Sequence, residues 1–335
     1  MSSHKTHSDK KIKRKKLLRT ICFLLVVVIV VSLALLILQK WENQQGNTPV
    51  ATPVDNTITY KGEKYIKKNV ETMLFLGLDK YEGEIDNNSY NNDQQSDFLM
   101  LFVIDNKNST CSALHINRDT MAEISVLGLA GEKVGSVNKQ LALAHTYGDG
   151  GMKSCRNTAE AVSKVLGGVE IHDYISVTMD AVPSLNDLVG GVEVTVLDDF
   201  TGVDDTLIKG ETVTLMGEQS ITYVRSRYGM EDSSNNNRME RQRQYMDAFI
   251  DRASQCVEAD EEFLFDAVEV LSEYMVSNCS VPELERFFEN VSTFDFTDIR
   301  YLEGEYIKGE SYMEFYPDES STEEIIMNMF YEVVR

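Results

Sequence analysis

Three short apolar stretches decide the fold: ETMLFLGLD (71–79), FLMLFVID (98–105) and CSALHINRD (111–119). Each has the length of a buried strand, and turn residues at 105–108 separate the last two. A polar residue ends or begins each run abruptly. We therefore expect three central strands with charged side chains at their ends.

Further along the chain, strand patterns alternate with helical patterns. The predicted strands cover 173–177 and 190–199, and the predicted helices cover 138–147, 154–166, 180–188, 217–223, 237–256, 261–276, 282–290 and 322–334. Ser280, with Glu283 three residues later, has the spacing of a capping box. Such alternation is typical of an α/β protein whose helices cover both faces of a mixed central sheet.

The N-terminal region has the pattern of a membrane anchor. ICFLLVVVIVVSLALLIL (21–38) is apolar apart from Ser32 and is long enough to cross a bilayer as a helix. Eight basic residues lie within 1–20, so the positive-inside rule predicts a cytoplasmic basic tail. A cleaved signal peptide is the alternative, but no small-x-small cleavage site follows. The sequence favours an uncleaved single-pass anchor in the cell membrane, with the remainder extracellular.

The chain after the anchor divides into a stalk and one domain. Residues 39–69 hold two of the five prolines and little apolar material, which favours an extracellular stalk with an edge hairpin. Residues 70–335 then form one extracellular domain of ordinary size, without an internal repeat.

Charge narrows the choice of ligand. The formal net charge is −22, and the part after residue 41 carries 23 basic and 53 acidic residues, a net charge of −30. This balance excludes nucleic acid, whose binding needs many phosphate-neutralising contacts. Five arginines nevertheless lie in YVRSRYGMEDSSNNNRMERQRQ (223–244), and eight arginines but no lysine lie within 210–306. Arginine is preferred for bidentate phosphate recognition, so this bias favours an oxyanion site.

The helical spacing of the arginines selects among them. Arg238 and Arg241 are three apart and share a helix face with Tyr245. Arg225 and Arg227 share a face only if the chain between them is extended. The alternative for the whole group is a solvated helix face that pairs with nearby acidic residues.

Acidic residues stand at the ends of the predicted strands. Asp79 ends the first strand, Asp97 precedes the second, and Arg118 and Asp119 end the third. If the second strand is antiparallel to the first, Asp79 and Asp97 meet and favour a hard cation such as Mg²⁺ between them. The alternative makes one a turn residue and the other a helix cap, and spacing alone leaves both interpretations open.

Other catalytic patterns are absent from the sequence. No GxSxG, HExxH, Walker A or GxGxxG motif occurs, and His145 fits a packing residue better than a catalytic base. The four cysteines after the anchor match no zinc pattern. They predict either two disulfides, Cys111 with Cys155 and Cys256 with Cys279, or buried free thiols.

The order of motifs resembles that of the LytR-CpsA-Psr family, which are membrane-anchored ligases of the Gram-positive cell envelope. The motifs are FLGLDK, QSDFLMLFVID, INRDTM, VNKQLALAHTYGDGG, DYISVTMDAVPSLNDLVGGVEVTV and GEQSITYVRSRYGMEDSSNNNRMERQRQY, within residues 70–255. The resemblance implies an α-β-α sandwich with an apolar pocket for a polyprenyl chain. It also implies transfer of an anionic glycopolymer, such as wall teichoic acid or capsule, from an undecaprenyl pyrophosphate carrier to a peptidoglycan acceptor.

The resemblance also assigns roles to residues. It implies that Mg²⁺, or Mn²⁺ in its place, binds Asp79 and Asp97. It implies catalytic roles for Asp79, Asp97, Arg118 and Asp119. It implies pyrophosphate binding by Arg118, Arg225, Arg227, Arg238 and Arg241.

Three positions depart from the family pattern. Gln95 stands where an arginine is common, Lys80 where a small residue is common, and Asn237 where a glycine is common. These differences bear on substrate preference. The segment 258–335 matches nothing in the family pattern, and we expect it to be helical cover.

The proposed reaction is phosphoryl transfer, which needs positioning and charge stabilisation rather than a nucleophilic side chain. Two alternatives stay open from the sequence. One is a metal-dependent hydrolase that releases the lipid-linked polymer to water. The other is a non-catalytic, membrane-anchored regulator that binds polyprenyl phosphates.

Overall fold

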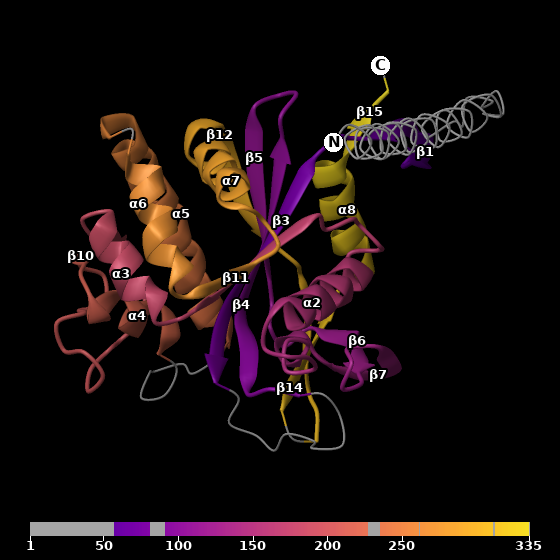
Figure 1. The fold of residues 1–335 in the computed structure, drawn as a ribbon, viewed down its shortest axis with the longest axis horizontal. Helices are drawn as coiled ribbons and strands as arrows, with labels where there is room; N and C mark the ends of the chain where they lie inside the picture. The colour runs from indigo at the N-terminus through magenta and orange to yellow at the C-terminus, as the bar shows by residue number, and fades with distance from the viewer. Residues whose placement is uncertain (1–56, 81–90, 227–234, 261, 311, 335) are drawn as a thin grey trace, which may run out of the picture. The chain divides into compact units, whose positions relative to one another are not determined.

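The computed structural model describes residues 57–80, 91–226, 235–260, 262–310 and 312–334. Its centre is a six-stranded sheet in the order β11-β8-β3-β4-β5-β12 (Figure 1). The strands are β11 (Met275–Ser277), β8 (Asp173–Thr178), β3 (Glu71–Lys80), β4 (Gln94–Asp105), β5 (Thr110–Ile116) and β12 (Asp295–Tyr301). β3 is antiparallel to β4 and parallel to β8, and β5 is parallel to β12. The mixed central sheet is therefore confirmed.

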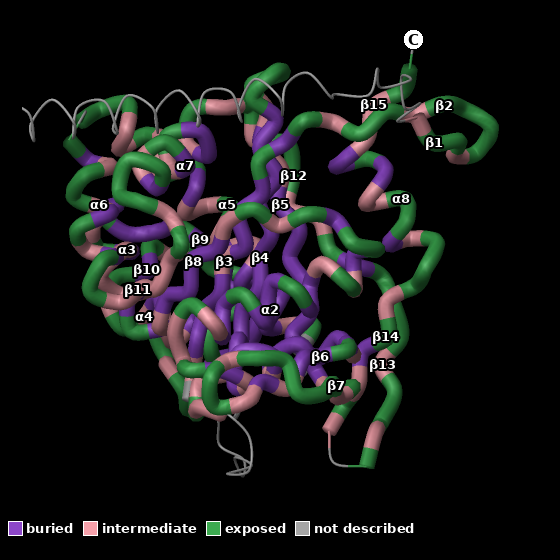
Figure 2. The backbone as a smooth tube through the Cα atoms, turned by 45° about the vertical axis from the view of Figure 1, so that its right-hand side comes forward, coloured by how far each residue is buried: buried purple, intermediate pink, exposed green. Residues whose placement is uncertain are grey.

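β4 shows why the central strands are apolar throughout. Leu99 and Leu101 face one core, and Met100 and Phe102 face the other. Successive side chains of a strand point to opposite faces, so a strand covered on both sides needs apolar residues at every position. Figure 2 shows this central part of the chain as a buried region surrounded by exposed helices and loops.

Helices cover both faces of the sheet. On one face lie α2 (Met152–Val165) and α8 (Glu319–Phe330), and on the other lie α3 (Ala181–Leu188), α5 (Asn235–Ala259), α6 (Phe263–Ser272) and α7 (Val281–Thr293) (Figure 1). Val162 of α2 packs in the first core, and Ile250 of α5 and Leu284 of α7 pack in the second. The architecture is the expected α-β-α sandwich.

Smaller elements surround this sandwich. The remaining strands are β1 (Thr57–Tyr60), β2 (Glu63–Lys67), β6 (Met121–Leu127), β7 (Lys133–Gln140), β9 (Val192–Thr195), β10 (Thr212–Leu215), β13 (Gly304–Lys308), β14 (Met313–Pro317) and β15 (Tyr331–Val333). β1 and β2 form the predicted hairpin, and β2 also pairs with β15. A third apolar core joins the β9–β10 hairpin to α4 (Glu218–Arg225) and α5.

Several local predictions are confirmed. Ser280 caps α7, and the Glu283 carboxylate accepts from the Ser280 backbone N–H at 2.7 Å, which completes the capping box. His145 is fully buried, as expected of a packing residue.

The helix predicted at 138–147 is wrong. Residues up to Gln140 belong to β7, which pairs with β6, and only a short 3-10 turn, η1 (Leu141–Leu143), follows. Val137 lies opposite Ile124 in this hairpin. Pairing with a neighbouring strand here outweighs the local helical pattern.

The C-terminal segment is not only helical cover. The helix predicted at 261–276 ends at Ser272, and β11 follows it, while the helix predicted at 322–334 ends at Phe330 before β15. β11 and β12 supply both edge strands of the central sheet. Because a strand gains its stability from a partner elsewhere in the chain, a local pattern does not reveal such short segments.

The disulfide prediction is wrong, and the alternative of free thiols holds. Cys111, Cys155, Cys256 and Cys279 are all free. Cys111 packs in the core on one face of the sheet and Cys155 in the core on the other, so the sheet separates them.

The predicted anchor at 21–38 lies outside the described residues. Within the part of the chain that the structure describes, no helix is both long enough and apolar enough to cross a membrane.

Candidate active site

The two aspartates predicted at the strand ends lie on neighbouring antiparallel strands. Gly77 pairs with Phe98 and Leu78 pairs with Ser96, so Asp97 is the extra residue of a β-bulge in β4. Asp79 pairs with Gln95 in the same ladder. The antiparallel arrangement on which the cation interpretation depends is therefore present, and both aspartates belong to one end of the sheet.

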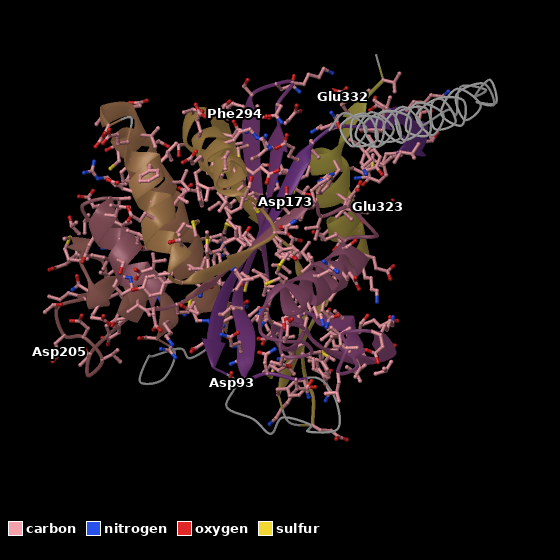
Figure 3. All side chains as sticks on the ribbon, in the orientation of Figure 1. Asp93, Asp173, Asp205, Phe294, Glu323 and Glu332 are labelled. Carbon is pink, nitrogen blue, oxygen red and sulfur yellow. The ribbon has the colours of Figure 1, made fainter. Side chains whose placement is uncertain are left out.

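A glycine makes this bulge fit. A Cβ atom at Gly77 would lie 2.9 Å from the Cβ of Phe98, closer than real side chains approach. The glycine in FLGLD thus lets the two strands come together where Asp97 leaves the regular pattern. In Figure 3, Asp93, which precedes β4, marks this end of the sheet, and Phe294 marks the opposite end.

Asp97 lies between two guanidinium groups. Arg118 Nη1 donates to Asp97 Oδ1 at 2.5 Å, and Arg238 Nη1 donates to Asp97 Oδ2 at 3.2 Å. All three residues are buried, with Arg238 only 2% exposed. Arg118 Nη2 also donates to Gln95 Oε1 at 2.9 Å. A buried carboxylate with two arginines forms a compact, strongly polar centre in a region of low dielectric constant.

Asp79 has its own arginine. Arg225 Nη2 lies 2.6 Å from Asp79 Oδ2, and the Arg225 side chain is 51% exposed. Arg225 is the last residue of α4, and Ser226 after it is extended. Arg227 lies outside the described residues.

Asp119 supports the turn that carries Arg118. Its Oδ1 accepts from Gln140 Nε2 at 2.9 Å and lies 3.7 Å from Arg118 Nε. The predicted pair Arg118-Asp119 is therefore placed beside Asp97, directly after β5.

Arg241 lies in a different cluster from the other arginines. It forms an ion pair with Asp198, and its Nε and Nη2 donate to the backbone carbonyls of Tyr223, at 2.8 Å, and Ser226. Its guanidinium also lies 5.4 Å from the centre of the Phe200 ring. At 1% exposure, Arg241 is engaged by the protein itself. The structure does not bring it to Asp97.

An apolar pocket begins beside the aspartate and arginine cluster. Gly77, Phe98 and Val224, which are near neighbours of Asp79, Asp97 and Arg225, all line it. Between the sheet and helices α3, α5, α6 and α7, the lining continues with Phe75, Phe102, Leu185, Met246, Phe249 and Phe287. The pocket holds about 1300 Å³ of empty space, counting the part open to solvent. Its apolar lining suits a long apolar ligand with a polar end at the arginines.

One buried cysteine could be mistaken for a catalytic nucleophile. Cys155 Sγ lies 3.8 Å from His145 Nε2 and 3.2 Å from Ser176 Oγ. Burial raises the pKa of Cys155 to about 11 and lowers the pKa of His145 to about 4. The pair is therefore a neutral thiol beside a neutral imidazole, a state that suits packing rather than nucleophilic attack.

The family follows from a direct comparison. The model of the LytR_cpsA_psr family matches residues 38–329. The chain belongs to the LytR-CpsA-Psr family.

Two relatives in this family illustrate the similarity. TagV of Bacillus subtilis (strain 168), named a polyisoprenyl-teichoic acid--peptidoglycan teichoic acid transferase, is 31% identical over 72% of this chain and 59% of that protein. TagU of Bacillus cereus (strain AH820), with the same activity in its name, is 32% identical over 58% of this chain and 56% of that protein. The chain thus spans less than two thirds of the length of these relatives.

A solved structure agrees with the fold. The crystal structure of B. subtilis TagV superposes with a TM-score of 0.58 at 26% identity, covering 79% of this chain and 97% of that one. The mixed α/β fold with its central sheet is therefore that of the LytR-CpsA-Psr family.

The donor atoms fit a hard divalent cation of the kind that the family resemblance implies. Asp79 and Asp97 supply carboxylate oxygens from adjacent strands, and Mg²⁺ is commonly held by one or two carboxylates together with substrate phosphates. Within the described residues, no group of three or more His, Cys, Asp or Glu side chains could hold a metal by itself. A cation here would need oxygens from the substrate or water as well.

Sequence reasoning missed several residues around the site. Asp198 lies near the end of the predicted strand 190–199, much as Asp79 lies at the end of its strand, so the same signal could have found it. Asn117, Asn236 and Tyr306 meet only through tertiary contacts. No local pattern marks them.

Proposed function

We propose that this protein is a phosphotransferase that moves an anionic glycopolymer, such as wall teichoic acid, from an undecaprenyl pyrophosphate carrier to peptidoglycan. Membership of the LytR-CpsA-Psr family and the names of its relatives support this assignment. The observation that carries it is the adjacency of two features: Asp97 held between Arg118 and Arg238, and an apolar pocket that begins at Phe98.

The two features match the two parts of such a substrate. The planar guanidinium groups of Arg118, Arg225 and Arg238 suit the oxygens of a pyrophosphate. The pocket suits the polyprenyl chain, whose apolar surface gains from leaving water. A lipid-linked pyrophosphate would therefore place its phosphorus atoms at the strand ends and its chain between the sheet and the helices.

The proposed reaction exchanges one phosphorus–oxygen bond for another. A hydroxyl oxygen of the peptidoglycan acceptor forms a bond to the phosphorus attached to the glycan. The bridging bond of the pyrophosphate breaks, and its electron pair leaves with undecaprenyl phosphate. The hydroxyl proton passes to Asp119 or to one of the other two aspartates. Arginines near the phosphates stabilise the developing charge.

A divalent cation would complete the site, and Asp79 and Asp97 are the residues that would hold it. When bound, Mg²⁺ or Mn²⁺ would neutralise charge on the leaving phosphate. In the structure the same carboxylates are engaged by Arg225, Arg118 and Arg238. A cation on the carboxylates would leave these guanidiniums available to phosphate oxygens.

The predicted anchor agrees with a lipid-linked substrate. Residues 21–38 would hold the chain at the cell membrane with the basic tail inside and the domain outside. The carrier lipid and the peptidoglycan acceptor would then be within reach of one domain.

The full-length chain in detergent, given lipid-linked teichoic acid, peptidoglycan and Mg²⁺, tests the proposal. We expect phosphodiester-linked polymer on peptidoglycan and release of undecaprenyl phosphate. Arg118→Ala and Arg225→Ala should each lower the rate by about 100-fold or more, because each removes a donor for the developing charge. Arg286, exposed on α7, is the matched control, and Arg286→Ala should change the rate by no more than about twofold.

Other outcomes would identify the alternatives. Release of free polymer to water at the same rate with or without peptidoglycan would identify a hydrolase. Binding of the lipid without turnover by the wild type, retained in Asp97→Ala, would identify a regulator. Thermal unfolding of each variant separates loss of chemistry from loss of the fold.

A further inference from the structure

The β13–β14 hairpin closes one side of the candidate active site. Phe315 N donates to the carbonyl oxygen of Asp119 at 2.9 Å, and Gln140 Nε2 donates both to the carbonyl of Met313 and to the Asp119 carboxylate. The hairpin belongs to the C-terminal segment, which is far from the arginines in sequence. It therefore brings a separate part of the chain to the turn that carries Arg118.

Tyr306 of this hairpin joins two parts of the site. Asn117 Nδ2 donates to the Tyr306 hydroxyl at 2.5 Å, and that hydroxyl donates to Asn236 Oδ1 at 3.0 Å. Asn117 immediately precedes Arg118, and Asn236 lies two residues before Arg238 in the first turn of α5. One hydroxyl thus connects the backbone segments of the two arginines that hold Asp97.

The local geometry makes this connection stiff. Asn117 Oδ1 accepts from the backbone N–H of Asp119 at 2.9 Å, so the Asn117 side chain also shapes the turn. The Tyr306 ring packs against Phe315, with 5.0 Å between the ring centres, and Phe315 is buried. A ring fixed in this way holds its hydroxyl at a defined position.

We propose that Tyr306 is a positioning residue that keeps Arg118 and Arg238 at the spacing required for the reaction. The inference rests on the proposed phosphoryl transfer, in which these arginines bind the pyrophosphate. It assigns a role to a segment for which the sequence predicted only cover. Tyr306 acts through the two arginines and does not itself contact the reacting atoms.

The hairpin contains a matched control. The Tyr316 hydroxyl donates to Glu314 Oε2 at 2.7 Å, and both residues belong to β14. Tyr316→Phe therefore removes one hydroxyl and one hydrogen bond from the same hairpin, without touching the turn or α5.

The first experiment measures transfer kinetics of the full-length chain. Tyr306→Phe should lower kcat by about 10-fold or more and change KM for the lipid-linked substrate by much less, because misplaced arginines fail mainly in the transition state. Tyr316→Phe should leave kcat unchanged. A kcat for Tyr306→Phe equal to that of the wild type would overturn the inference.

A double-mutant cycle tests the connection itself. Asn236→Ala removes the acceptor of the tyrosine hydroxyl and leaves the hairpin intact. If the connection carries the effect, Asn236→Ala should also lower kcat, and the double variant with Tyr306→Phe should be little worse than Tyr306→Phe alone. If the loss of kcat in the double variant equals the product of the losses in Tyr306→Phe and Asn236→Ala, the two residues act independently. That result would refute the connection.

Amide hydrogen exchange provides a readout that does not depend on activity. In Tyr306→Phe, exchange should accelerate both at 117–120 and in the first turns of α5, and in Tyr316→Phe at neither. If the wild type fails to transfer polymer while this pattern is seen, the proposed function fails and the positioning role stands. Acceleration confined to the hairpin would show that Tyr306 only stabilises its own strand.

Discussion

Arg238 and Arg241 lie one turn apart on α5, yet they hold different parts of the molecule. Arg238 binds the carboxylate of Asp97, in the bulge of β4 at the candidate active site. Arg241 binds Asp198 and the end of α4. Both are almost completely buried, and both come from the motif RMER. Residue type and burial are alike, so only the partners distinguish the arginine that we propose to bind the ligand from the structural one.

The partners also differ in whether they can be exchanged. Asp97, the partner of Arg238, is a side chain that could bind a cation and release the guanidinium to a phosphate. Arg241 is held partly by two backbone carbonyls, those of Tyr223 and Ser226, which cannot leave without unfolding the end of α4. Arg225 is the last residue of that helix. Arg241 therefore holds the backbone from which the Arg225 side chain reaches Asp79.

Replacing Arg241 should have the largest effect, and the effect should be on stability. Arg241→Met leaves Asp198 buried without its cation, and breaking a buried ion pair from one side costs about 3–5 kcal/mol in the free energy of unfolding. Chemical denaturation of the full-length chain measures this. The folded fraction should keep transfer activity within about 10-fold of the wild type.

A second variant separates the ion pair from the packing. In Asp198→Leu combined with Arg241→Met, no charge is left unpaired, so much of the lost stability should return. If Arg241→Met keeps the free energy of unfolding of the wild type but loses all transfer, Arg241 contacts the ligand. Arg241 and Arg238 would then have the same role.

Replacing Arg238 should give the opposite pattern. Arg238→Met should lower the rate of transfer by about 10²–10³-fold, comparable to the loss of one donor for developing charge. Its effect on the free energy of unfolding should be smaller than that of Arg241→Met, because Asp97 keeps Arg118 at 2.5 Å. Steady-state kinetics and chemical denaturation of Arg238→Met and Arg241→Met, measured in parallel, check this. If the two variants lose transfer rate and free energy of unfolding in the same proportion, the prediction is wrong.

The central strands and the site at their ends could be predicted from the sequence, because both depend on local signals. A strand buried on both faces needs a continuous apolar run, and a charged residue at either end of such a run stands out, as Asp79 and Asp97 do. The sequence could not show which arginine of the motif RMER contacts Asp97. Helical spacing puts Arg238 and Arg241 on one face, so both were equally good candidates.

What the sequence did not reveal depends on long-range pairing. β11 and β12 are edge strands that pair, within the described residues, only with β8 and β5. Tyr306 likewise acquires its partners Asn117 and Asn236 only when the C-terminal hairpin docks. Such long-range contacts do not change the local hydrophobic periodicity, so a single sequence does not reveal them.

A further prediction concerns His115, a buried histidine close to Arg238. Burial, and then the charges of Arg243 and Arg238, lower the pKa of His115 from 6.5 to about 3. Between these pH values the unfolded chain binds a proton that the folded chain does not, so the free energy of unfolding falls as the pH falls below about 6.5. The slope should be about 1.4 kcal/mol per pH unit for this one group.

The variant His115→Gln removes that titration, so its stability should depend less steeply on pH than that of the wild type. His145→Gln gives an internal comparison, because burial lowers the pKa of His145 only to about 4 and its window is narrower. Denaturation between pH 7 and pH 3 measures both slopes, and the two windows differ between pH 4 and pH 3. Equal slopes in the wild type and His115→Gln would mean that His115 takes up its proton in the folded state. A further positive charge would then have to be accommodated beside Arg243 and Arg238.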